Sequence, residues 1–209
     1  PRAPTVAAEL KAFVDNHRAT LQRAGFDYAE TVYPGNLANC LPMALRCHNL
    51  EWTTQGALTV IDRARAAGKP FFLYYPTTID HIPGGNRKYD ADPLACSDGY
   101  LDKAPHVMPP RSTIPERLKA AGFDPDSDAG NVLWLDDAVA ALLKRLESNG
   151  QLENTVIIYL TDNGLDGGKG SLYDAGVHVP ALVWAKRFSG QRRVAAPVSS
   201  VDILPTILD

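Results

Sequence analysis

The chain has 209 residues, of which 45% are hydrophobic and 22% charged, and a chain of this length and composition can bury a sizeable core as one globular unit. Its formal net charge of −3 provides no basic field to hold a polyphosphate backbone, which argues against nucleic acid as a partner. No apolar run approaches the roughly 18 residues that a membrane-spanning helix needs, and residues 1–4 lack the apolar stretch of a signal peptide. The sequence therefore predicts neither nucleic-acid binding nor membrane insertion. It leaves the compartment open, and a periplasmic or secreted location is compatible with the complete protein.

Four segments carry the marks of helices. Three of them place apolar residues at intervals of three and four, the spacing of one helix face, and each is followed by a glycine, which commonly ends a helix. The fourth is short and lies near the end of the chain. The predicted helices cover residues 5–24, 53–67, 131–149 and 200–208.

Apolar runs rich in β-branched or aromatic residues separate these helices, at residues 69–75, 155–160 and 179–185. Such runs are typical of strands buried on both faces, as parallel strands are. Helices that alternate with them predict an α/β fold with a mainly parallel sheet flanked by helices, in which ligands sit at the carboxyl ends of strands. Between these elements, residues 77–130 are rich in Pro, Gly and Asp and are predicted to form a long loop excursion, functional or mobile.

Thr161-Asp162-Asn163-Gly164 follows the second predicted strand. A carboxylate beside a carboxamide offers adjacent hard oxygen ligands for Ca²⁺ or Mg²⁺ without placing two negative charges side by side. Asn-Gly is also a strong turn former, so a tight turn without a metal explains the same four residues. The sequence leaves both interpretations open.

Lys169 lies among glycines, seven residues after Asp162. Glycines let backbone N–H groups approach an anion closely, and a lysine adds a point charge suited to sulfate or phosphate. The segment is not a nucleotide P-loop, because the positions that would need Gly and Ser or Thr hold Asn163 and Gly170. A flexible, solvated loop is the alternative.

His81 follows the first predicted strand. Imidazole changes protonation near working pH, so a histidine there can donate to a substrate oxygen or act as a general acid, although most single histidines do neither.

Other candidate nucleophiles and acids have weaker support. No Gly-x-Ser-x-Gly elbow occurs, which leaves an α/β-hydrolase mechanism without its nucleophile. Cys40 and Cys47 lie near His48, but neighbours in sequence need not pair in space, and we expect structural or incidental roles. Asp136 and Asp137 fall inside a predicted helix, where successive side chains point about 100° apart, so solvated or capping roles are expected for both.

Taken together, these segments resemble the sulfatase family within the alkaline phosphatase superfamily. Several independent motifs match in both order and spacing, and the resemblance covers nearly the whole chain. The motifs are Lys69-Pro70-Phe71-Phe72-Leu73-Tyr74-Tyr75, His81-Ile82-Pro83, Asp136-Asp137-Ala138-Val139, Asn154-Thr155-Val156-Ile157-Ile158-Tyr159, Thr161-Asp162-Asn163-Gly164, Gly168-Lys169-Gly170-Ser171-Leu172-Tyr173, Val179-Pro180 and Val201-Asp202-Ile203-Leu204-Pro205-Thr206.

The resemblance implies roles for four residues. Asp162 and Asn163 would be ligands of a single divalent ion, usually Ca²⁺, while Lys169 would bind the sulfate group and His81 would hold the ester or leaving-group oxygen. The implied activity is that of an arylsulfatase-like sulfuric ester hydrolase acting on a small-molecule or glycan sulfate ester. A phosphodiester or phosphonate monoester hydrolase of the same superfamily, and a truncated relative that only binds an anion or a partner protein, are the alternatives.

The chain departs from the family at the nucleophile. Members use a formylglycine made in a Cys/Ser-x-Pro/Ala-x-Arg signature, which is absent here, because the segment that begins at Cys40 has Ala44 where Arg is needed. We therefore expect residues 1–209 to be the C-terminal portion of a single sulfatase catalytic domain, inactive as given, with the formylglycine in an N-terminal part that is missing. Asp174-Ala175-Gly176 stands where members commonly have Glu-Gly-Gly, and His178 where Arg is frequent, which leaves the subfamily and the substrate open.

Overall fold

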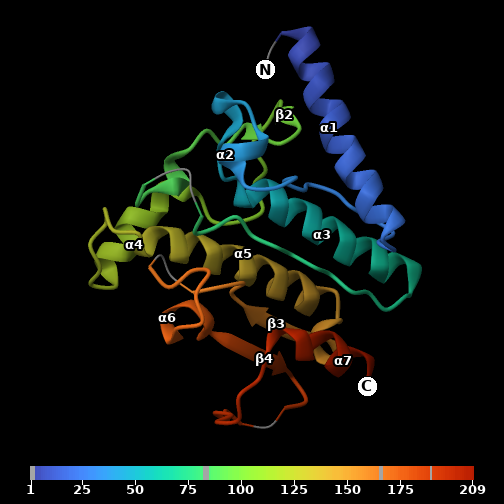
Figure 1. Cartoon of the computed structure of the whole chain (residues 1–209), viewed down its shortest axis with the longest axis vertical. Helices are drawn as coiled ribbons and strands as arrows, with labels where there is room; N and C mark the ends of the chain where they lie inside the picture. Colours follow the sequence, from blue (N-terminus) through green and yellow to red (C-terminus); the bar gives the residue numbers. More distant parts are fainter. Residues whose placement is uncertain (1–2, 82–84, 165–166, 189) are drawn as a thin grey trace. The chain divides into compact units, whose positions relative to one another are not determined.

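A computed structural model describes residues 3–81, 85–164, 167–188 and 190–209. The chain divides into two compact units, Pro1–Gln151 and Leu152–Asp209. The first unit is mainly helical, and the second is built on a pair of strands (Figure 1). None of the helices in these described stretches is long and apolar enough to cross a membrane.

The three long helices of the first unit agree with the prediction. They are α1 (Pro4–Arg23), α3 (Leu50–Ala67) and α5 (Ala129–Ser148). α3 begins earlier than its periodicity indicates, because the Asn49 side chain caps it by accepting a hydrogen bond from the Trp52 amide at 3.2 Å. Gly68 ends the same helix in the left-handed conformation, with φ 62, as the sequence predicts.

α3 and α5 lie side by side and run in the same direction (Figure 1). Near their N-terminal ends, Trp134 Nε1 donates a hydrogen bond to Glu51 Oε1 at 3.0 Å. Near their C-terminal ends, the Asn149 side chain donates to Asp62 at 3.0 Å, and Arg145 forms an ion pair with the same carboxylate. Polar contacts at both ends therefore fix the register of the two helices.

The sequence predicts a long loop excursion between residues 77 and 130, and the described part of this segment contains several short elements. It contains η2 (Lys88–Asp90), β1 (Ala95–Cys96), β2 (Gly99–Tyr100), η3 (Arg111–Thr113) and α4 (Ile114–Ala120), and β1 pairs with β2 as an antiparallel hairpin. Tyr89, Ile114 and Leu118 of this segment are buried in one cluster with Leu50 of α3 and Trp134 of α5. Apolar residues too scattered to show a period thus form half of a core.

A second apolar cluster connects α1 to the segment before α3. That segment holds α2 (Leu37–Cys40) and η1 (Met43–Leu45). Leu10 and Val14, on one face of α1, are buried against Leu37, Leu41 and Leu45. Burying an aliphatic side chain contributes about 1.5–3 kcal/mol, so these contacts stabilise the position of α1, together with the ion pair between Arg18 and Asp98 at 2.7 Å.

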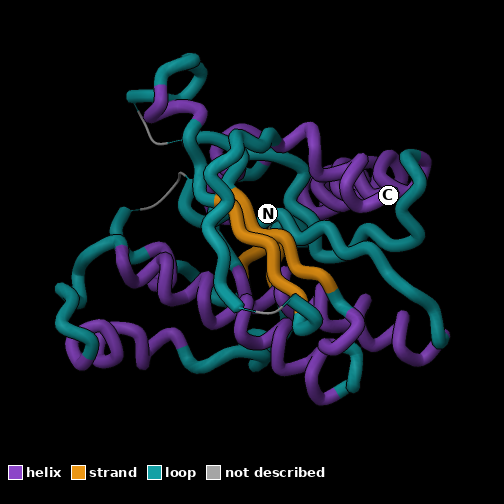
Figure 2. The backbone as a smooth tube through the Cα atoms, turned by 90° about the horizontal axis from the view of Figure 1, so that it is seen from below, coloured by secondary structure: helices purple, strands orange, loops and turns teal. Residues whose placement is uncertain are grey.

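The second unit contains the two C-terminal predicted strands, β3 (Val156–Leu160) and β4 (Ala181–Ala185), which lie close to their predicted positions. They pair antiparallel, with Val156 opposite Ala185 and Leu160 opposite Ala181 (Figure 2). The prediction of parallel neighbours is wrong for this pair. A parallel pair needs a crossover to the far end of the sheet, whereas β4 begins at Ala181, opposite Leu160 at the end of β3.

Short helices complete the second unit. They are η4 (Leu152–Asn154), α6 (Asp174–Val177), η5 (Ser200–Asp202) and α7 (Ile203–Leu208). The last two confirm the predicted closing helix. A capping box starts it, in which the Ser199 amide donates to the Asp202 carboxylate at 2.8 Å.

The predicted strand at residues 69–75 has no strand partner among the residues that the structure covers. The segment is extended, but Phe72 and Tyr74 are exposed, so the prediction of burial on both faces is wrong. The other face touches α3, where the Tyr75 hydroxyl lies 3.2 Å from Thr53 Oγ1 and 2.9 Å from Thr54 Oγ1. Apolar composition alone does not distinguish one buried face from two.

Candidate functional site

The end of β3 carries the predicted metal pair. Asp162 is exposed, and its Oδ1 accepts a hydrogen bond from the backbone N–H of Asn163 at 3.0 Å. A carboxylate has about four lone-pair positions, so this one hydrogen bond leaves room for a cation. Directly before the pair, the buried Thr161 hydroxyl has no hydrogen-bond partner in the described part of the chain, which adds an unengaged oxygen beside it.

Glycines allow the turn after β3 and the turn that carries Lys169 to pack against the same backbone segment, residues 175–176. The Gly164 amide donates to the Gly176 carbonyl at 2.9 Å. A Cβ on Gly164 would lie 1.9 Å from the carbonyl oxygen of Ala175, and one on Gly168 would lie 2.4 Å from the carbonyl carbon of the same residue. Any side chain at these positions would displace backbone, so both turns pack against the start of α6.

The turn around Lys169 is ordered by local hydrogen bonds. The Ser171 amide and hydroxyl both donate to the Gly168 carbonyl, at 3.0 and 2.6 Å. Gly167 and Gly170 have φ values of 94 and 78, a region that favours glycine. Lys169 itself is exposed. A compact turn thus presents its ammonium group, although its predicted contact with sulfate stays a prediction.

The pair fits a divalent cation only as part of a ligand set. Asp162 and Asn163 supply hard oxygen donors, whereas Ca²⁺ takes about 6–8 oxygen ligands. Among the described residues no group of three or more His, Cys, Asp or Glu could hold a metal ion. Any cation held here would need further oxygen ligands from water, substrate or other residues of the protein.

The predicted leaving-group residue, His81, ends a turn in the first unit. Its backbone N–H donates to the Thr78 carbonyl at 2.9 Å. His48 is 2% exposed, and its Nδ1 lies 2.8 Å from Thr78 Oγ1. His48 therefore fastens the turn that ends in His81, a role that the sequence did not indicate.

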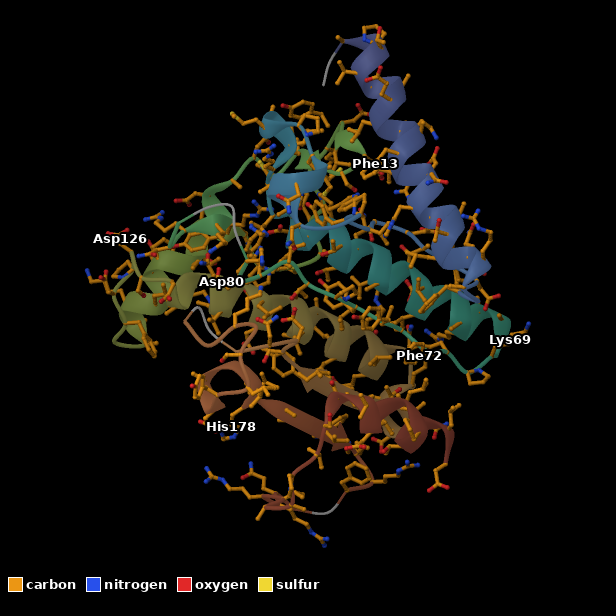
Figure 3. All side chains as sticks on the ribbon, in the orientation of Figure 1. Phe13, Lys69, Phe72, Asp80, Asp126 and His178 are labelled. Atoms are coloured by element: carbon orange, nitrogen blue, oxygen red, sulfur yellow. The ribbon has the colours of Figure 1, made fainter. Side chains whose placement is uncertain are left out.

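A polar cluster next to His81, in which Lys88 and Asn131 are buried and Asp80 is exposed, was also missed. Lys88 forms an ion pair with Asp80, and the Asn131 side chain donates to Asp80 Oδ1 at 3.2 Å beside the first turn of α5 (Figure 3). Asn131 is fully buried. The only available sequence signals were a carboxylate directly before His81 and an Asn at the start of a helix, and neither is specific.

The surroundings of the cysteines agree with the expectation that none of them is a nucleophile. Burial raises the pKa of the thiols of Cys40 and Cys47, and it raises the pKa of Cys96 to about 12. A raised pKa lowers the fraction of reactive thiolate. The position of the missing signature arginine holds Ala44, and Arg46 instead donates from Nε to the backbone of its own segment. Cys40 therefore does not fit a formylglycine position.

The two neighbouring aspartates on α5 have different environments. Asp136 is exposed, as expected, but Asp137 is 5% exposed, and its two oxygens accept hydrogen bonds from Arg117 at 2.7 Å each. This contact raises the pKa of Arg117. The prediction of a solvated or capping role is wrong for Asp137, which anchors α4 to α5.

Residues 22–209 match the sulfatase family model. The chain belongs to the sulfatase family. This confirms the resemblance seen in the motifs, and membership implies an α/β fold of the alkaline phosphatase type. Two of the residues that depart from the family pattern, Asp174 and His178, contact each other at the surface. They form an i,i+4 pair at 3.3 Å.

Several curated sulfatases are similar to this chain. It is 26% identical to the sulfatase YdeN of Escherichia coli, over 90% of the chain and 33% of that protein. It is 27% identical to human arylsulfatase A, over 69% of the chain and 25% of that enzyme. A third relative, the N-acetylglucosamine-6-sulfatase of Capra hircus, is 40% identical over 37% of the chain and 15% of that protein. The chain thus spans a third or less of the length of these relatives.

Proposed function

We propose that the complete protein containing this chain is a sulfuric ester hydrolase, and that this chain supplies its cation and sulfate contacts. The observation that carries the proposal is the family match over residues 22–209. Further support comes from the packing of Gly164 and Gly168 against one carbonyl, which keeps the Asp-Asn turn and the lysine turn on one short stretch of backbone.

Each of the four residues has a task in this proposal. Asp162 and Asn163 hold a divalent cation, Ca²⁺, through their side-chain oxygens. Lys169 binds the non-bridging sulfate oxygens with its ammonium group, and His81 donates a hydrogen bond or a proton to the oxygen of the leaving alcohol. Ca²⁺, when bound, offsets the negative charge of the sulfate group.

The nucleophile lies outside these contacts. The family resemblance implies a formylglycine, but the segment from Cys40 to Ala44 does not fit one, because Ala44 stands where the signature needs an arginine. In the proposal another part of the protein provides the nucleophile, together with the strands that would complete a mainly parallel sheet. The residues of this chain then bind the sulfate ester, offset its negative charge and protonate the leaving-group oxygen.

The proposed substrate is a sulfate ester of a small molecule or a glycan. The test is hydrolysis by the complete protein of 4-nitrophenyl sulfate, bis(4-nitrophenyl) phosphate and 4-nitrophenyl phenylphosphonate. We expect the sulfate ester to have the highest kcat/KM. A preference for either phosphorus ester would assign the protein to the other chemistry of the superfamily, and the absence of all three activities would favour a binding protein.

Two substitutions probe the assigned residues in the same assay. We expect Asp162→Asn to weaken Ca²⁺ binding about tenfold or more, because it removes the charged ligand, as measured by isothermal titration. Lys169→Met should raise KM or lower kcat for the sulfate ester, because the ammonium group is lost. Lys119→Met, at another exposed lysine, is the matched control, and equal losses in both lysine variants would contradict the assignment.

A further inference from the structure

The residues that lead into His81 are held one after another by buried partners. Thr78 lies 2.8 Å from the ring of the buried His48 and accepts the His81 amide hydrogen at 2.9 Å. Ile79 packs against the apolar cluster that contains Leu50 and Trp134. Asp80, directly before the histidine, is held by Lys88 and Asn131. The backbone that orients His81 is thus fastened at three successive positions.

Asn131 is the centre of the last of these contacts. Its Oδ1 accepts the backbone N–H of Lys88 at 2.9 Å, while its Nδ2 donates to Asp80 at 3.2 Å. One fully buried amide therefore joins η2 to the turn and uses its donor and its acceptor in opposite directions. The amide carries its donor and its acceptor on two separate atoms of one short planar group, which lets Asn131 contact both segments from the first turn of α5.

Lys88 has an unusual environment for a lysine. Its side chain is 8% exposed, against 39% for its partner Asp80, and its Nζ also donates to the Gly85 carbonyl at 3.3 Å. A lysine is rarely buried unless it is paired, because its charge loses hydration. A surface ion pair would not need this burial, so the arrangement indicates that the position of the Asp80 carboxylate is closely fixed.

We propose that Lys88 and Asn131 are positioning residues, which hold Asp80 and through it set the orientation of His81 toward the leaving-group oxygen of a sulfate ester. The role of His81 rests on the proposed function. Lys88 and Asn131 act through the turn and have no substrate contact in this proposal. A small displacement of a proton donor lowers rate steeply, and the loss is largest where the leaving group needs the proton most.

The test compares two sulfate esters in the complete protein. 4-Nitrophenol leaves readily without a proton, whereas phenol is a poorer leaving group. We expect Lys88→Met and Asn131→Asp to lower kcat/KM for phenyl sulfate about tenfold or more, and for 4-nitrophenyl sulfate less than about twofold. Asn131→Asp keeps the acceptor for the Lys88 amide but turns a carboxylate oxygen toward Asp80.

Asp90→Asn is the matched control, because Asp90 lies in the same η2 segment but pairs with Arg87 at the surface. It should change neither substrate. Equal losses on the two esters in Lys88→Met and Asn131→Asp, or no loss on either, would overturn the positioning role.

If the wild-type protein hydrolyses no sulfate ester, the proposed function fails, and hydrogen exchange decides the positioning role separately. The His81 amide should exchange faster in both variants, by more than the change in the free energy of global unfolding accounts for. Unchanged exchange would overturn the positioning role as well.

Discussion

The ion pair between Glu51 and Arg111 connects several elements of the first unit, and we expect its removal to lower the stability of this unit. The two side chains are 9% and 12% exposed. Arg111 uses every N–H of its guanidinium, with Glu51, the Asn49 side chain and the carbonyls of Tyr89 and Ala91 as acceptors. Glu51 is equally engaged, since it also accepts from Trp134 at 3.0 Å. A single carboxylate therefore joins α3, α5 and η3.

Glu51→Gln keeps the size of the side chain and removes its charge. One amide oxygen can still accept a hydrogen bond, but the new NH₂ group faces the guanidinium donor that Glu51 Oε2 accepts in the native protein. Removing one partner of a buried pair leaves an uncompensated charge and costs about 3–5 kcal/mol. Because one acceptor is retained, we expect the free energy of unfolding to fall by about 3 kcal/mol, at the lower end of that range.

Urea unfolding of the chain, followed by circular dichroism, measures the change. With m near 2 kcal/mol/M, the midpoint should fall by about 1.5 M. The control is Asp126→Asn, since Asp126 pairs with Arg87 and is 75% exposed (Figure 3), and such a surface pair contributes about 0–1 kcal/mol. A Glu51→Gln variant that loses less than about 1 kcal/mol would refute the view that this carboxylate is a central contact of the core.

Two further predictions concern the second unit and the cysteines. Gly168→Ala places a Cβ 2.4 Å from the Ala175 backbone, so we expect faster hydrogen exchange throughout α6, whereas Gly35→Ala, where the added Cβ meets nothing within 4 Å, should leave exchange in its own segment unchanged. The Cys96 thiol has its pKa raised from 9.0 to about 12 by burial, so native protein at pH 8 should react with a disulfide reagent far more slowly at Cys96 than urea-unfolded protein does. The same shift makes the stability contribution of this thiol complete below pH 9 and lost progressively as the pH rises toward 12. A fast-reacting Cys96 at pH 8 would contradict the burial.

The sequence predicts the helices because their signals are local. Periodic apolar residues and a following glycine locate α1, α3 and α5 to within a few residues, and Gly68 ends α3 as expected. The error at the start of α3 has a local cause too. Asn49 is a good capping residue, but its side chain lies before the first periodic positions and also donates to the carbonyls of Pro93 and Ala95.

Strand pairing depends on contacts that no local pattern contains. The runs at residues 155–160 and 179–185 predict β3 and β4 correctly as strands, yet their antiparallel order follows from how residues 161–180 return. The run at residues 69–75 has the same apolar composition and lacks a strand partner among the residues described. A β-branched or aromatic run therefore predicts extended backbone, while its neighbours and its number of buried faces are set by the rest of the fold.

Buried polar residues are the hardest to foresee, because their types are usually exposed. Lys88, Asn131 and Asp137 would each be assigned to the surface on residue type alone, yet all three are buried. Each contacts a partly exposed charged side chain from another segment, as Asp137 contacts Arg117. The contact with the partner offsets the loss of hydration on burial. A single sequence does not identify which residue is the partner.

The glycine-rich stretch after β3 illustrates how composition and geometry combine at the candidate site. Composition permits either a flexible loop or a compact anion-binding turn. The described residues form a compact turn, because Gly164, Gly168 and Gly176 lie where backbone meets backbone, and a Cβ on Gly176 would come within 2.1 Å of the Gly168 carbonyl oxygen. These glycines are needed for close packing, and the positive φ values of Gly167 and Gly170 add turns beside it. The stretch that carries Lys169 is therefore compact because it is rich in glycine, and its binding of an anion stays a prediction.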